Sequence, residues 1–256
     1  KNAAVPVMIM AGLAVLLICG ASLAKSIASF TGTAGSAVYS WLGGIGLALC
    51  PVVGLFLRFH SNVPVPGAMD DLAGCAVVAG LGKYLHDAKR SKDFFPENTE
   101  IILFASAAEE SGLRGAKRYV SAHRKELQEI PSYGIFLDGI YDERYLTVVK
   151  RELYTGAKHD PYLIGLAQSC AAERGWPLKT LSIPLGGTDA AAFSREGGVP
   201  ATCLLCQDIS RLVPNYHTRF DTIEHIRPKS LTVSLQLVIG MLEKIDEAKG
   251  RIADQA

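Results

Sequence analysis

Residues 100–138 read EIILFASAAEESGLRGAKRYVSAHRKELQEIPSYGIFLD, and this stretch decides the fold. The uninterrupted apolar run at 100–107 predicts a buried strand, and the amphipathic pattern over 112–128 predicts a helix. A second apolar run at 133–137 predicts another strand. Strands that are apolar throughout and are joined by a helix are typical of a mostly parallel sheet with helices on both faces. The stretch therefore predicts an α/β fold.

The same alternation of strands and helices continues on both sides of this stretch. Helical spacing of apolar residues predicts helices over 70–88, 160–174 and 229–249, and short apolar runs predict strands over 178–185 and 201–206. In parallel sheets, functional residues gather in the loops that follow the carboxyl ends of the strands. Polar residues that directly follow these strands are therefore the first candidates for a site.

The first sixty residues differ from the rest of the chain. No charged residue occurs in 5–23 or in 37–57, and each run has about the 20 residues that a helix needs to cross a bilayer. This predicts a two-span transmembrane hairpin over 1–60, in contact with the lipid bilayer of a multi-pass membrane protein, before a globular domain over 61–256. A pair of buried core helices is the alternative, whereas a signal peptide does not explain the second run.

Bulk composition excludes some functions. The net charge of +1 gives no reason to expect a nucleic-acid partner. Hydrophobic residues make up 49% of the chain, an excess concentrated in the apolar runs. Cys203 and Cys206 form a CxxC pair, which is compatible with zinc or redox chemistry. Their apolar surroundings, ATCLLC, favour instead a buried strand in which cysteine acts as a small apolar residue.

Four short segments place acids or a histidine where strands end: GAMDD at 67–71, AAEESGLRG at 107–115, FLDG at 136–139 and YHTRFDT at 216–222. Taken singly, each has a simpler explanation, such as helix capping by the paired aspartates, an acidic first helical turn, or an incidental loop histidine. Carboxylates together with one imidazole are, however, a ligand set that zinc accepts in hydrolases. The four segments together predict a metal site.

In this order the segments resemble the co-catalytic zinc aminopeptidase family, which also includes glutamate carboxypeptidase-like enzymes. The resemblance covers the chain from about Pro64 to the last predicted helix. It implies the zinc exopeptidase fold and hydrolysis of N-terminal peptide bonds of a peptide substrate by a water that bridges two zinc ions. It also implies that Glu109 is the general base and that the zinc ligands are Asp70, Glu110, Asp138 and His217.

The resemblance extends to two further residues. Tyr216 is similar to the residue that donates a hydrogen bond to the tetrahedral oxyanion in some members of the family. The segment GGTDAAAFSREGGVPA at 186–201 resembles the one that lines the substrate pocket, and it makes Asp189 a candidate substrate-binding residue.

One ligand of the family pattern, a histidine in an HxD motif, is harder to place. His60 is a candidate, but Asn62 stands where the pattern has aspartate, and His60 follows an apolar run rather than a strand of the sheet. The other interpretation, which we favour, is that this ligand precedes Lys1 and that the sequence is a fragment. The other histidines, predicted to be solvated and without a role, are His86, His123, His159 and His225.

Other functions are compatible with the same residues. A carboxypeptidase, or a single-zinc cyclase on the same scaffold, would use Asp70, Glu110 and His217 with fewer metal ions. A catalytically inactive membrane-bound homologue that acts as a binding module belongs to a different class. Retention of both Glu109 and Glu110 favours an enzyme, because a binding module has no need of a base beside a ligand.

Overall fold

The computed structural model describes residues 4–32, 37–54, 63–211 and 213–253. The chain forms two compact units. The first comprises Lys1–Pro66 and Pro214–Phe220, and the second comprises Gly67–Val213 and Asp221–Ala256. His60 lies outside the described residues, so its predicted role as a ligand stays a prediction.

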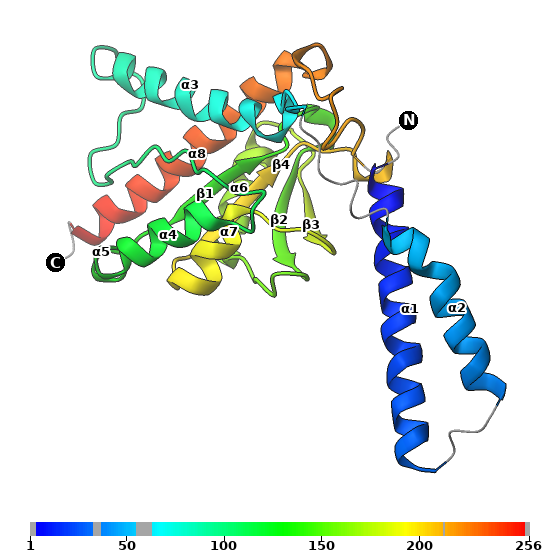
Figure 1. The fold of residues 1–256 in the computed structure, drawn as a ribbon. Helices are drawn as coiled ribbons and strands as arrows, with labels where there is room; N and C mark the ends of the chain where they lie inside the picture. Colours follow the sequence, from blue (N-terminus) through cyan, green and yellow to red (C-terminus); the bar gives the residue numbers. More distant parts are fainter. Residues whose placement is uncertain (1–3, 33–36, 55–62, 212, 254–256) are drawn as a thin grey trace. The chain divides into compact units, whose positions relative to one another are not determined.

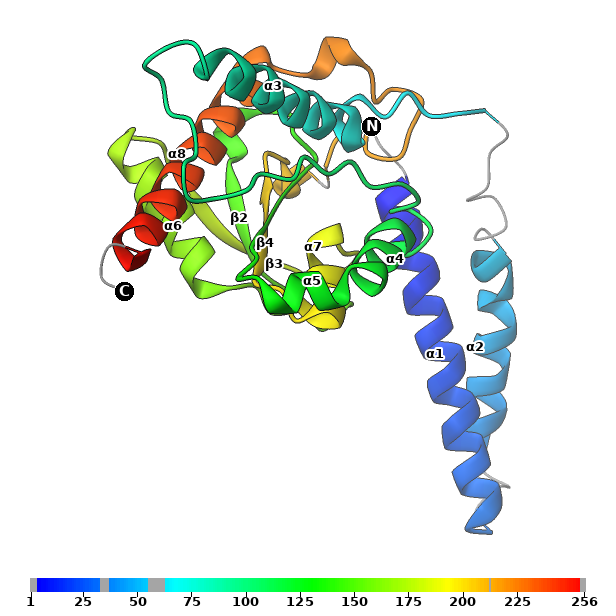
Figure 2. The same cartoon turned by 90° about the vertical axis from the view of Figure 1, so that its left-hand side faces the viewer.

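Two apolar helices make up most of the first unit. Helix α1 (Ala4–Phe30) and helix α2 (Ala37–Gly54) run antiparallel, side by side (Figures 1 and 2). Many of their large apolar side chains point outward, and Leu16 is 69% exposed. Among the described residues, one helical stretch is long and apolar enough to cross a membrane, Ile9–Phe30. The apolar part of α2 is shorter, so length and composition support one candidate span rather than the predicted two.

A four-stranded sheet forms the centre of the second unit, in the order β1-β4-β2-β3. Strand β1 (Gly134–Asp138) pairs in parallel with β4 (Ala201–Leu205), and β2 (Thr147–Glu152) pairs in parallel with β3 (Lys179–Ile183). The contact between β2 and β4 is antiparallel. The prediction of a mostly parallel sheet in an α/β fold is therefore confirmed.

Helices cover both faces of this sheet (Figures 1 and 2). Successive side chains of a strand point to opposite faces, so Leu204 joins one buried core while Cys203 and Leu205 join the other. The first core is covered by α3 (Ala73–Ala88), α6 (Pro161–Glu173) and α8 (Pro228–Ala253). The second is covered by α4 (Arg114–Ala122), α5 (Arg124–Glu129), α7 (Asp189–Ala191) and the turn Ala192–Gly197.

Several sequence predictions of secondary structure are confirmed, two are corrected, and one strand was not predicted. The segment 100–107 is not a strand, since it pairs with no strand of the described structure, and Ile102 in it is 56% exposed. Its apolar composition predicted burial, but a strand also needs a hydrogen-bonding neighbour. Conversely, β2 was not predicted, because Lys150 and Arg151 interrupt its apolar pattern. The helix predicted over 112–128 is divided at His123 into α4 and α5.

The CxxC cysteines are completely buried, as their apolar surroundings predicted. Cys203 lies within β4, and Cys206 follows this strand directly. Burial raises the pKa of both thiols, that of Cys206 to about 12. The thiols therefore stay protonated and act as small core side chains.

Candidate metal centre

The turn that carries Asp70 is held by a residue far away in the sequence. Asp70 lies in the turn Ala68–Leu72, directly before α3. The backbone N–H groups of Met69 and Asp70 donate hydrogen bonds to the two carboxylate oxygens of Asp221, at 2.8 and 3.2 Å. The Asp221 residue is only 2% exposed. Asp221 therefore positions Asp70, a role that the sequence signalled only through its place in the YHTRFDT segment.

Asp138 is the last residue of β1, where the chain turns away from the sheet at Gly139. Gly139 has φ = 59°, and a Cβ at this position would collide with the side chain of Gln207. Burial raises the pKa of Asp138 well above its usual value, and the nearby carboxylates of Asp71 and Asp70 raise it further. The acids predicted from separate motifs thus interact electrostatically at the end of this strand.

Asp71 has a similar environment. Burial and the charge of Asp70 raise its pKa to about 8, although the N–H of Gly74 donates a hydrogen bond to its carboxylate at 3.2 Å. Glu109 also contributes to the rise. Carboxylates that are crowded together repel one another unless a cation balances their charge. This set of donors therefore fits a divalent cation, and oxygen ligands are compatible with zinc.

The two adjacent glutamates lie in a tight turn before α4. The N–H groups of Gly112 and Leu113 donate to the carbonyl oxygen of Glu109 at 2.9 and 2.8 Å, and Leu113 has φ = 60°. Glu109 is half-buried, whereas Glu110 is exposed. Adjacent side chains leave such a turn in different directions, so the two carboxylates are available for different roles.

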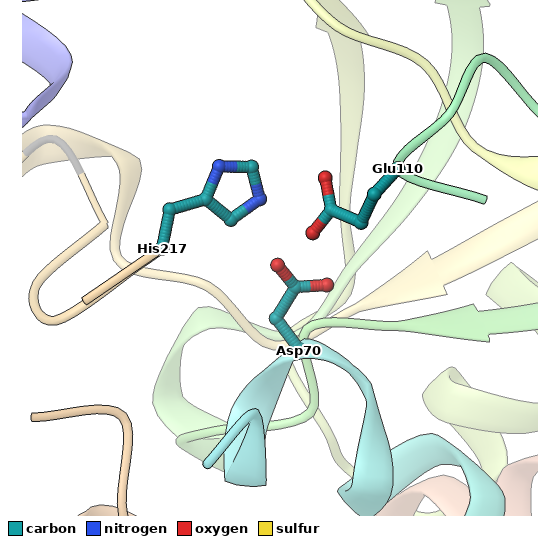
Figure 3. A group of neighbouring side chains, drawn as sticks. All are labelled: Asp70, Glu110 and His217. Atoms are coloured by element: carbon teal, nitrogen blue, oxygen red, sulfur yellow. The ribbon is translucent and has the colours of Figure 1, made fainter. Parts of the chain in front are cut away.

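Figure 3 shows the side chains of Asp70, Glu110 and His217. One potential ligand atom from each of these residues lies within 4.8 Å of the other two. His217 is exposed and has φ = 55°, and its ring stacks on that of Tyr216 with a centroid separation of 3.8 Å. An imidazole and two carboxylates at these separations are compatible with coordination of one metal ion.

Asp189 is the first residue of α7. Burial raises the pKa of its carboxyl group. The Ser106 hydroxyl lowers this pKa, and the charge of Glu152 raises it further. The preceding residue, Thr188, is anchored to Glu152: its N–H donates at 3.2 Å and its hydroxyl at 2.7 Å. Glu152 therefore holds the backbone from which the Asp189 side chain projects.

The prediction that His159 is solvated is wrong. This residue is only 4% exposed, and its Nε2 lies 3.1 Å from a carboxylate oxygen of Glu152, which is itself fully buried. Its Nδ1 lies 3.2 Å from the hydroxyl of Ser194. The charged neighbours of His159 in the sequence suggested exposure, but the tertiary structure places the imidazole between two polar side chains. No sequence motif signalled this pair.

The chain belongs to peptidase family M28, whose family model matches residues 57–242. It is 27% identical over 186 residues to aminopeptidase YwaD of Bacillus subtilis (strain 168), and the match covers 70% of this chain and 38% of that protein.

Solved structures of aminopeptidases share the fold. BSAP, a zinc aminopeptidase from Bacillus subtilis, matches with a TM-score of 0.59 and 27% identity, over 72% of this chain and 43% of that one. LapB from Legionella pneumophila matches with a TM-score of 0.61 and 18% identity, over 73% of this chain and 49% of that one. At this identity the match supports the fold alone. The chain thus spans less than half of the length of each of these relatives.

Proposed function

We propose that the chain is a zinc-dependent exopeptidase, an aminopeptidase that removes N-terminal residues from a peptide substrate. The observation that carries this proposal is the crowding of carboxylates at the end of β1, where Asp70, Asp71 and Glu109 interact with Asp138. Such a concentration of negative charge is stabilised by bound cations. Membership of peptidase family M28 and the likeness to BSAP, a zinc aminopeptidase, support the choice of zinc and of this reaction.

Two zinc ions would be held by the four residues of the motifs. We assign as the side chains that would hold these ions Asp70, Glu110, Asp138 and His217. The short separations between the side chains of Asp70, Glu110 and His217 support the assignment of these three residues as ligands (Figure 3). When bound, zinc supplies a Lewis acid that polarises a peptide carbonyl and lowers the pKa of a water molecule.

The remaining residues handle protons and substrate. Glu109 accepts a proton from the attacking water and delivers it to the leaving amine, for which its position next to a ligand is suited. Tyr216 donates a hydrogen bond to the oxyanion that develops on the carbonyl. Asp189, supported by the bond between Thr188 and Glu152, contributes to the substrate pocket.

Metal removal tests this function. We expect the purified chain to hold two equivalents of zinc by plasma mass spectrometry and to hydrolyse leucine p-nitroanilide. Treatment with 1,10-phenanthroline should abolish hydrolysis, and added zinc should restore it, because zinc activates both water and carbonyl.

An N-acetylated leucine anilide is the matched control, since an aminopeptidase requires a free amine. Cleavage of the blocked substrate would contradict the aminopeptidase assignment, and one equivalent of zinc would contradict the dinuclear site. Zinc binding without any hydrolysis would identify a binding module instead.

We also propose that α1 and α2 form a membrane hairpin over 1–60, separate from the catalytic domain over 61–256. The exposed apolar side chains of the two helices support this proposal. Leu17 is 57% exposed and Leu47 is 75% exposed.

A charged residue at the centre of a membrane helix costs about 2.5–3.5 kcal/mol. Leu17→Asp should therefore lower the fraction of the chain that stays with membranes after alkaline carbonate extraction, whereas Leu17→Ala should not. Complete recovery of the unaltered chain in the soluble fraction would rule out the hairpin.

A further inference from the structure

A cavity of about 780 Å³ lies in the second unit, at the end of the sheet where β1 and β4 begin. Asp138 lies at the opposite end, where β1 ends. The lining of the cavity includes Ala201, the first residue of β4, which pairs with Gly134 at the start of β1. Asp138 is the last residue of that strand, four residues further on. At 3.3 Å per residue, the cavity and the carboxylate cluster are separated by roughly 13 Å along the strands. The cavity is therefore distinct from the candidate metal centre.

Positive charge is concentrated in the lining of the cavity. Arg151 of β2 lies opposite Lys158 in an isolated antiparallel bridge, and on its other side it pairs with Ser182 of β3. Directly opposed residues point to the same face of a sheet, so these three side chains form a row. Like charges that face each other in this way are destabilising unless an anion lies between them. Lys150 adds a third cation to the lining.

Protein anions offset only part of this charge. Lys150, Arg151 and Lys158 form no ion pair within the described part of the chain. Asp160 contributes one carboxylate to the lining, which accepts the N–H of Leu163 at 3.0 Å and caps α6, so a single negative charge stands against three cations. The row thus keeps a net positive charge that faces the cavity.

Hydroxyl and imidazole groups complete the lining. Ser182 and Ser194 supply hydroxyl groups, and the ring of His159 is buried in the wall. Because His159 contacts Ser194 on one side and Glu152 on the other, the wall is held in one arrangement before any ligand arrives. A binding site whose polar groups are already ordered loses less conformational entropy when the ligand binds.

We propose that this cavity binds a small phosphate monoester. A phosphate dianion matches two opposed cations in charge, and the guanidinium fork of Arg151 can donate two parallel hydrogen bonds to it. The Ser182 hydroxyl can donate to a remaining phosphate oxygen. The volume lies within the range of about 300–1,000 Å³ that is usual for small-molecule sites, so the ester group has room beside the phosphate.

Calorimetric titration of the zinc-loaded full chain with phenyl phosphate tests the proposal. The double variant Arg151→Gln/Lys158→Gln should bind phenyl phosphate roughly a hundredfold more weakly, because it lacks the paired hydrogen bonds of the Arg151 guanidinium and the charge of the Lys158 ammonium. The matched control, Arg118→Gln/Lys125→Gln, removes the same charge from exposed positions on α4 and α5 and should bind like the unaltered chain. Thermal unfolding midpoints establish that both variants are folded.

Three outcomes would overturn the proposal. If the unaltered chain did not bind phenyl phosphate, the proposal would be wrong. Equal affinities of the unaltered chain and the Arg151/Lys158 variant would place the phosphate elsewhere, such as at the metal ions. Equal weakening in both double variants would show that only the overall charge of the protein attracts the anion.

Discussion

Glu109→Gln should lower kcat/KM for leucine p-nitroanilide by roughly 10²–10⁴-fold, the usual contribution of a general base. The amide keeps the size and shape of the glutamate side chain but cannot accept the proton of the attacking water. We assign Glu109 as a base rather than as a ligand, so the zinc content of the variant should equal that of the unaltered chain. Steady-state kinetics and plasma mass spectrometry on the same preparation measure both quantities.

Glu129→Gln is the matched control, because it makes the same chemical change at an exposed position at the end of α5. It should leave both kinetics and zinc content unchanged. If Glu109→Gln retained most of the activity, another group would have to be the base. If it lost zinc together with activity, Glu109 would be a ligand and its role would have to be exchanged with that of Glu110.

Glu152→Ala should destabilise the second unit by about 3–5 kcal/mol, the cost of removing one member of a buried charged network. The fully buried carboxylate accepts hydrogen bonds from Thr188 and from the hydroxyl of Thr155 at 3.0 Å, and it contacts the ring of His159. Alanine would leave these groups buried without their partner, and each unsatisfied group carries a desolvation cost.

Urea unfolding followed by the fluorescence of Trp176 measures this effect, because Trp176 packs against the core of the second unit. A Trp41→Phe background removes the other tryptophan, which lies in the first unit. The control is Glu196→Ala, whose half-exposed carboxylate pairs with Lys117 at 3.3 Å and should contribute less than about 1 kcal/mol. Similar losses in both variants would show that the Glu152 network contributes no special stability.

The candidate metal centre illustrates what local sequence patterns can predict. Asp138 and the Glu109–Glu110 pair were identified because apolar runs precede them, and polar residues after such runs gather at one edge of a parallel sheet. This reasoning needs only the periodicity of the chain and the residue types at the ends of its elements. This reasoning predicted β1 correctly, before Asp138. It was wrong for the run at 100–107, which precedes the two glutamates but forms no strand.

Contacts between distant residues were beyond such reasoning. Asp221 accepts hydrogen bonds from the Asp70 turn across 151 and 152 positions of sequence, and Thr188 reaches Glu152 across 36. The charged neighbours of His159 in the sequence predicted exposure, yet its ring is buried between the carboxylate of Glu152 and the hydroxyl of Ser194. Local composition contains no information on which of many polar residues will meet in the folded chain.

The sequence by itself determined the α/β class, the apolar character of the first helices and the residue types available to bind metal. These properties follow from periodicity and composition, which each segment carries alone. Only the tertiary structure decided that 100–107 lacks a strand neighbour, that Glu152 and His159 pair, and that Arg151 faces Lys158. Pairing depends on the register and crossing of strands, and these are set by the packing of the whole unit rather than by any one segment.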